Sequence, residues 1–146
     1  MLRRGSIGQD SETFFANLAA TFHYVFVGEY LAAPMTAPEA KIDSALRTYA
    51  DGMLSADRSV GFAQGDWAYV LNRATRHTSH RGDEARAALR EVALGVADNV
   101  LTHGIQGSMH DVLGVVTTLA ELQNAAPGLL LTPRPLRSLL DRRPFL

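Results

Sequence analysis

The chain has 146 residues, which is enough for one domain that buries its own core without disulfides or metals. It is 47% hydrophobic and 20% charged, which excludes an intrinsically disordered chain, and its net charge of −1 argues against a general nucleic-acid binder. Cysteine does not occur, which excludes disulfides, thiolate metal sites and cysteine nucleophiles.

The first predicted element is a long helix over residues 12–33. Asp10 or Ser11 is placed to cap its start, and Pro34 ends it. Residues 1–10 are expected to form a flexible N-terminus. A histidine and a glutamate interrupt the apolar run of this segment, whereas a membrane-spanning helix needs ~20 residues with hardly a charge. We therefore expect a helix of a soluble protein and no membrane span.

This helix is apolar on two sides. At helical spacing, one side carries Phe14, Leu18, Phe22 and Val25. The opposite side carries Ala16, Ala19, Ala20, His23, Val27 and Tyr30. A helix that is apolar all round is either central in its domain or shared with another chain. We favour the central position, and the alternative is an oligomer interface on the alanine side.

Four further helices follow, each bounded by capping and breaking residues. They run from Thr36 to Gly52, from Asp66 to Thr78, from Gly82 to His103 and from Ser108 to Pro127, with a loop over 53–65. No segment has the alternating pattern of a strand. We predict an all-α fold, an antiparallel bundle of about five helices over residues 1–128. Residues 129–146 are expected to form a basic, leucine-containing C-terminal tail with a short helix.

The segment around the last turn separates two histidines. We predict that residues 104–108 break the helix, so that His103 ends one helix and His110 begins the next. The inward residues of the fifth helix are then expected to be Val112, Leu113, Val116, Leu119 and Ala120. This places outward a stripe of His110, Gly114, Thr117 and Glu121, in which the glycine leaves open space beside the histidine.

The segment HDVLGVVTTLAEL, residues 110–122, resembles the phosphorylatable-histidine helix of two-component signalling proteins. Asp111 directly after the histidine is similar to the pattern of histidine-kinase dimerisation domains, and Gly114 to that of histidine-phosphotransfer domains. The resemblance implies that His110 accepts a phosphoryl group and that Gly114 makes room for a receiver domain. Leu113 departs from the lysine usual before that glycine, and Gly114 departs from the asparagine or threonine usual in the kinases.

A basic run lies at the end of the third predicted helix. It contains Arg73, Arg76, His77, His80 and Arg81. Basic residues near a helix C-terminus complement the helix dipole, which is the interpretation we favour. The alternative is an anion or phosphate site. A metal site is disfavoured, because the neighbouring arginines repel a cation.

The tail places apolar residues among arginines. Its apolar members are Leu136, Leu139, Leu140 and Phe145. They are expected either to pack back over the bundle or to dock into a groove of a partner.

No serine-nucleophile motif and no phosphate-binding loop occurs in the sequence. We therefore expect a cytoplasmic, non-enzymatic interaction protein, an adaptor, accessory subunit or regulator, without cofactor or metal. It would bind a protein partner or form a homo-oligomer, and it would bind no nucleic acid. The alternatives are phosphotransfer through His110 and, less favoured, a histidine-based metal or haem site.

Overall fold

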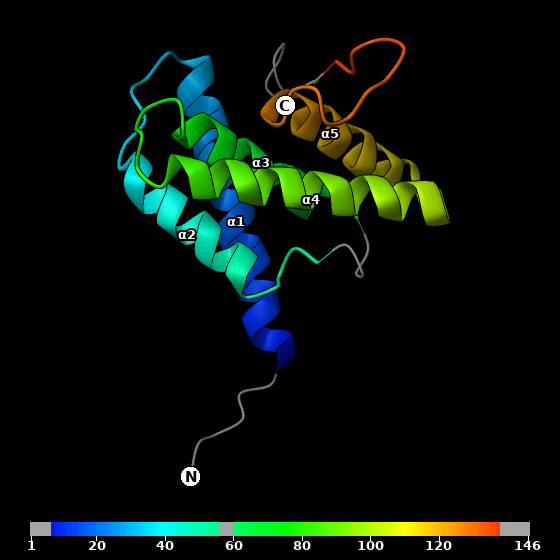
Figure 1. Ribbon diagram of the computed structural model, residues 1–146. Helices are drawn as coiled ribbons and strands as arrows, with labels where there is room; N and C mark the ends of the chain where they lie inside the picture. The colour runs from blue at the N-terminus through cyan, green and yellow to red at the C-terminus, as the bar shows by residue number, and fades with distance from the viewer. Residues whose placement is uncertain (1–6, 56–59, 138–146) are drawn as a thin grey trace.

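The computed structural model describes residues 7–55 and 60–137 of the chain (Figure 1). It contains five helices, α1 (Ile7–Tyr30), α2 (Pro38–Ala50), α3 (Phe62–Ala74), α4 (Gly82–His103) and α5 (Met109–Ala125). The described residues include no strand, which confirms the all-α prediction. Figure 1 shows α4 and α5 running side by side in opposite directions, with α1 steeply inclined to α4.

Several helix starts differ from the prediction. α1 begins at Ile7, so four of the ten residues expected to be flexible are helical, while 1–6 lie outside the described part. α2 is preceded by Ala37 in a left-handed conformation, and Thr36 is not its cap. α3 begins at Phe62, four residues before the predicted cap Asp66. In place of that cap, the Gly61 backbone N–H donates to the Gln64 side chain over 3.0 Å.

The last two helices follow the prediction closely. α4 ends at His103, and Gly104 and Gly107 have φ angles of 71° and 108°, which favour glycine. At the start of α5, the Ser108 hydroxyl accepts a hydrogen bond from the Asp111 backbone N–H. The Asp111 carboxylate accepts in return from the Ser108 backbone N–H over 2.8 Å. The predicted break over residues 104–108 is therefore confirmed.

The central helix of the domain is α3, not α1 as we expected. α3 contacts each of the other four helices, whereas α1 packs chiefly against α3. Trp67, Ala68, Leu71 and Ala74 of α3 are completely buried. The indole N–H of Trp67 donates to the backbone oxygen of Ala45 in α2 over 2.8 Å. A short helix can occupy the centre because apolar residues cover most of its circumference.

The hydrophobic core has two parts. The larger part lies among α2, α3 and α4, where Ile42, Trp67, Leu71 and Val96 are sealed from solvent. The smaller part joins α1 to α3 through aromatic rings. In it, Phe22 meets Tyr69 edge to face with ring centroids 5.2 Å apart. Only one side of α1 is used in this way.

α5 is rotated relative to the predicted orientation. Val116, the expected centre of its inward face, is exposed, whereas Gly114, Thr117 and Glu121 are buried. The reason is a close crossing between α3 and α5. A Cβ atom at Gly65 would lie 2.6 Å from the Thr118 hydroxyl oxygen, so α3 fits only because that residue is glycine. Small residues therefore form the contact, and Met109 and Val116 face outward.

The chain after α5 turns back along that helix. Residues 126–137 form turns and bends without a helix, and 138–146, which complete the predicted helical tail, lie outside the described residues. The side chain of Gln123 anchors the segment, because it donates to the backbone oxygen of Leu130 over 2.7 Å. It also accepts from the backbone N–H of Leu136 over 2.7 Å.

None of the described helices has both the length and the apolar content that a bilayer crossing requires.

Candidate functional site

A buried ionic cluster joins α1, α3 and α5. Arg73 is 2% exposed and Glu121 is 0% exposed. The Arg73 guanidinium donates to the Glu29 carboxylate over 2.9 Å and to the Glu121 carboxylate over 3.0 Å. Asn72 also donates to the Glu121 carboxylate over 3.0 Å. Arg73 therefore belongs to the buried core. It is not part of a surface anion site, which was the alternative interpretation of the basic run.

An aromatic ring completes this cluster. The Arg73 guanidinium lies over the ring of Tyr69 at 4.3 Å, a cation–π geometry. The Tyr69 hydroxyl donates to the Glu29 carboxylate over 2.8 Å. Burial and that hydrogen bond raise the pKa of Tyr69, so the hydroxyl keeps its proton at physiological pH. The cluster acts as a structural connection among three helices.

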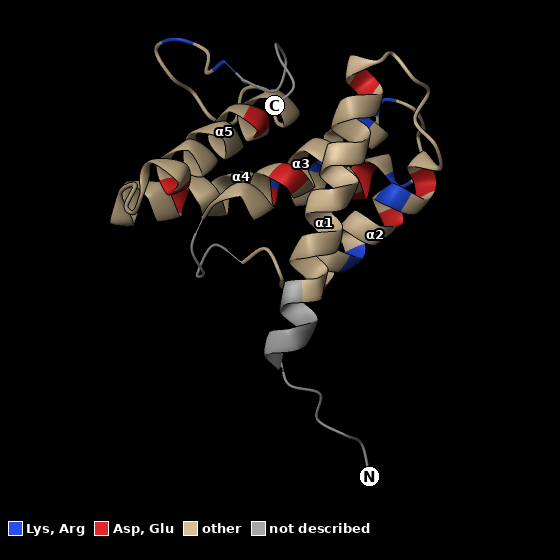
Figure 2. Ribbon diagram, turned by 180° about the vertical axis from the view of Figure 1, so that it is seen from behind, with Lys and Arg blue, Asp and Glu red and all other residues tan. Residues whose placement is uncertain are grey.

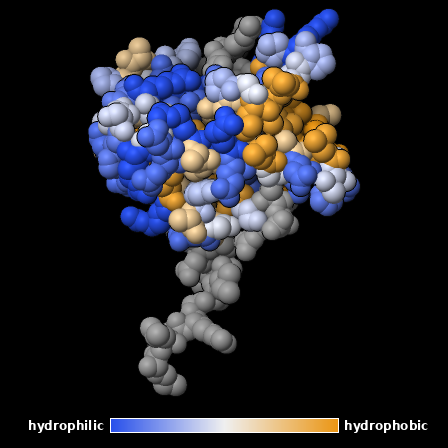
Figure 3. All heavy atoms as spheres, in the orientation of Figure 1, coloured by the Kyte–Doolittle hydropathy of each residue, from blue (hydrophilic) through white to orange (hydrophobic). Residues whose placement is uncertain are grey.

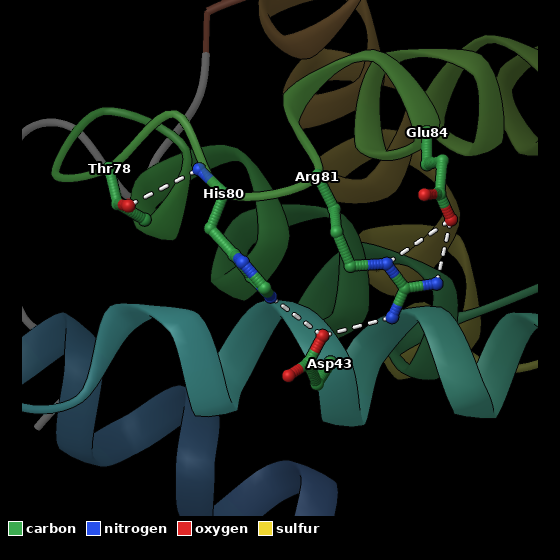
Figure 4. A network of polar contacts seen from close by, with 5 residues as sticks. All are labelled: Asp43, Thr78, His80, Arg81 and Glu84. Carbon is green, nitrogen blue, oxygen red and sulfur yellow. Dashed lines mark hydrogen bonds and ion pairs between the residues drawn. The ribbon is translucent and has the colours of Figure 1, made fainter.

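Two further basic residues of the run, His80 and Arg81, meet carboxylates of other segments (Figure 4). His80 and Arg81 both reach the Asp43 carboxylate of α2, each over 2.9 Å. Arg81 also donates to Glu84, with a shortest distance of 2.7 Å. Hydrogen bonds from His80 and Arg81 hold the pKa of Asp43 below its usual range. This network fixes the α3–α4 loop to α2 and neutralises the charges that an anion site would need.

The other two members of the run, Arg76 and His77, are exposed. α3 ends at Ala74, so His77 and His80 do not share a helical face as the metal alternative required. Over residues 7–55 and 60–137, no three histidine, aspartate or glutamate side chains are grouped so that they could hold a metal ion.

The two histidines of the α4–α5 turn are both exposed and have separate surroundings. The His103 ring is hydrogen-bonded to the Asn99 backbone oxygen over 3.1 Å. The His110 ring lies 4.7 Å from the ring of Phe62. A Cβ atom at Gly114 would lie 2.8 Å from that same Phe62 ring. Phe62 therefore fills the space that the phosphotransfer interpretation assigned to an approaching receiver domain. The predicted outward stripe is wrong at Gly114, Thr117 and Glu121, which are buried, whereas His110 is exposed as predicted.

The predicted interface on α1 lies largely at the surface. Ala16, Ala20, His23, Val27 and Tyr30 are exposed, and Ala19 is half-buried. The same face includes the exposed Tyr24 and Leu31, which the prediction missed. No Lys, Arg, Asp or Glu occurs between residues 13 and 28. Figure 2 shows this part of α1 without a charged residue.

Two open grooves flank this face of α1. One, of about 790 Å³, separates α1 from α2. Uncharged residues such as Ala20 and Tyr24 line it on the α1 side, and Lys41, Arg47 and Asp51 are among its residues on the α2 side. The other, of about 460 Å³, lies along the last turns of α1 and is lined by Tyr24, Val27 and Leu31, among others. The two grooves provide space for side chains of another molecule on both sides of α1.

A second apolar surface lies on the α4–α5 hairpin, and the sequence analysis did not identify it. We call it the hairpin face, and its exposed members are Leu94, Leu101, Ile105, Met109 and Val116. Figure 3 shows strongly apolar residues gathered over α5 and the adjoining end of α4. The seven-residue spacings from Leu94 to Leu101 and from Met109 to Val116 were the signal that could have revealed it.

The apolar residues of the tail divide between two regions. Leu136 is half-buried where the chain returns along α5. Leu139, Leu140 and Phe145 lie outside the described residues.

Asp66 of α3 is expected to make stability depend on pH. Burial raises its pKa from 3.8 to about 7, and nearby His23 opposes the shift. The folded state therefore keeps a proton that the unfolded chain releases above about pH 4. The associated stability is fully present below that pH and is lost as the pH rises through about 7.

Asp66→Asn is expected to raise the free energy of unfolding at about pH 8.5 by on the order of 1 kcal/mol, because no charge is then buried. At about pH 4 the two proteins should be nearly equal. Urea unfolding at both pH values measures this, with the exposed Asp98→Asn as a control. An equal effect of Asp66→Asn at both pH values would contradict the assignment.

No protein-family model, no curated protein and no solved structure matches this chain.

Proposed function

We propose that this chain is a non-enzymatic α-helical interaction protein, an adaptor, accessory subunit or regulator, and that it binds an amphipathic helix of a partner protein along α1. The observation that carries the proposal is the exposed, uncharged face of α1. Tyr24 and Tyr30 are 60% and 65% exposed there, and Val27 and Leu31 lie between and beside them. Isolated apolar residues are common on protein surfaces, but a continuous face of this kind indicates a binding surface.

The residue types on this face favour a protein partner. Tyrosine is enriched among the side chains that dominate binding energy, because its ring is large and its hydroxyl tolerates water. The absence of charge between residues 13 and 28 means that the partner must also present an apolar surface. A helix fits best, because its apolar side chains project in a row that the grooves beside α1 can receive.

The polar clusters support this function better than catalysis. Arg73 is enclosed between two carboxylates, and His80 and Arg81 are held by Asp43. Those contacts stabilise the fold, and their donors are directed at the protein itself. The exposed apolar face of α1 remains available for recognition.

The test is a comparison of partners recovered from the native cell with tagged wild-type chain and with Val27→Asp and Tyr30→Asp. Both side chains are exposed, so the substitutions should leave the helical circular dichroism unchanged. A specific partner should be lost with either variant, by about tenfold or more in affinity. Leu131→Asp changes a residue that is 85% exposed on another segment and should retain the partner.

Peptide binding then identifies the form of the partner. A synthetic peptide that covers the partner's amphipathic helix should bind wild-type chain and not Tyr30→Asp. Retention of every partner by both α1 variants, or recovery of no partner at all, would contradict the proposal.

A further inference from the structure

The hairpin face is the second exposed apolar surface, and it is separate from α1. Leu101 is 86% exposed in the last turn of α4, and Met109 is 82% exposed at the start of α5. Ile105 lies between them in the turn. Leu94 and Val116 continue the surface by two helical turns along each helix. The face thus covers both arms of a helical hairpin and its tip.

The charges around this face restrict what can cover it. Residues 99–110 contain no Lys, Arg, Asp or Glu, and the nearest ionised groups are Asp98 and Asp111. Both carboxylates would repel an anionic membrane, and the exposed Arg90, one helical turn before Leu94, adds a cation at the other end of the face. The surface therefore suits an apolar protein surface whose rim carries a few charges of both signs, as its own rim does.

The area of the face matches what a standard interface requires. The exposed fractions of its five members add up to about three whole side chains, or roughly 450 Å² at ~150 Å² each. A standard-size interface takes ~800 Å² from each partner, and ~60% of that area is apolar. One copy of the hairpin face supplies nearly all of the apolar part.

The hairpin geometry makes the face complementary to itself. In a twofold interface the same patch is used by both copies, so α4 of one copy can lie against α5 of the other. Two antiparallel hairpins that pair in this way form a four-helix arrangement with apolar residues at seven-residue spacing inside. We propose that two copies of this chain associate through the hairpin face about a twofold axis.

The purified full-length chain tests this directly, because no other component is needed. Sedimentation velocity from about 1 to about 100 µM should give twice the monomer mass of 15.8 kDa at the upper concentrations. Leu101→Asp and Met109→Asp should each weaken the dimer by about tenfold or more, since each would bury a carboxylate in the apolar interface. Both residues are so exposed that folding should be retained, which circular dichroism checks.

Matched control variants distinguish this dimer from association through other surfaces. Leu31→Asp just after α1 and Leu131→Asp after α5 also place a carboxylate at an exposed leucine and should leave the dimer intact. A wild-type chain that stays monomeric throughout would overturn the proposal. So would a dimer that survives Leu101→Asp and Met109→Asp, or one that Leu31→Asp dissociates. None of these outcomes depends on the partner proposed for α1.

Discussion

Arg73→Met is expected to lower the free energy of unfolding by about 3–5 kcal/mol, the usual cost of leaving a buried charge without its partner. Methionine keeps most of the side-chain volume, so the loss comes mainly from electrostatics. Glu121 is 0% exposed and would keep only its bond from Asn72 among the contacts described above. Glu29 should suffer less, because its side chain is 31% exposed and water can replace the guanidinium.

Urea unfolding of wild type and variant measures the effect. Arg86→Ala is the matched control, since its ion pair with Asp83 is exposed and should contribute less than about 1 kcal/mol. Adding Glu121→Gln to Arg73→Met should recover part of the loss, because no uncompensated charge then remains in the core. A loss below about 1 kcal/mol for Arg73→Met would show that the cluster does not stabilise the fold as described.

Gly65→Ala is expected to destabilise the protein by about 1–2 kcal/mol, although alanine is the better helix former by up to about 1 kcal/mol. Its Cβ would lie 2.6 Å from the Thr118 hydroxyl oxygen and 3.4 Å from the Thr118 Cα. The hydroxyl cannot turn away without cost, because it donates to the Gly61 backbone oxygen over 2.8 Å. The helices must therefore separate or lose that hydrogen bond.

Gly28→Ala in α1 provides the opposite expectation in the same chain. No atom lies within 4 Å of its added Cβ, so only helix propensity acts and stability should rise by about 0.5–1 kcal/mol. The double variant Gly65→Ala/Thr118→Ala should lose less free energy of unfolding than the sum of the losses in the two single variants, since the clashing oxygen is removed. If Gly65→Ala proves as stabilising as Gly28→Ala, the close crossing of α3 and α5 is not as described.

The α5 helix shows which features sequence patterns predict and which they do not. Its start at Met109, its Ser108 cap and the preceding glycine turn were all predicted from residues close together in the chain. Its orientation was predicted wrongly, because apolar periodicity placed Val116 at the centre of the inward face, whereas that residue is exposed. The helix instead turns small residues toward α3, where Gly65 and Gly114 permit a close approach. Met109 and Val116 then contribute to the hairpin face.

The basic run shows the same limit for charged residues. Arg73 meets carboxylates that are 44 and 48 residues away in sequence, and His80 meets one that is 37 residues away. Within the run itself there is no acidic residue, so the sequence favoured a dipole interaction or an anion site. Which charges pair depends on which helices cross, and short-range spacing contains no information about that.

By itself, the sequence determined that this protein is all-α and that no charge interrupts α1 between residues 13 and 28. It also determined where α4 ends and where α5 begins. Caps, glycines with positive φ and helical periodicity act over a few residues, so one sequence is enough to detect them. Only the tertiary structure decided that α3 is central, that Arg73 is buried and that apolar residues cover the α4–α5 hairpin. Those outcomes depend on how closely two helices can approach, which is set by the side chains of both helices together.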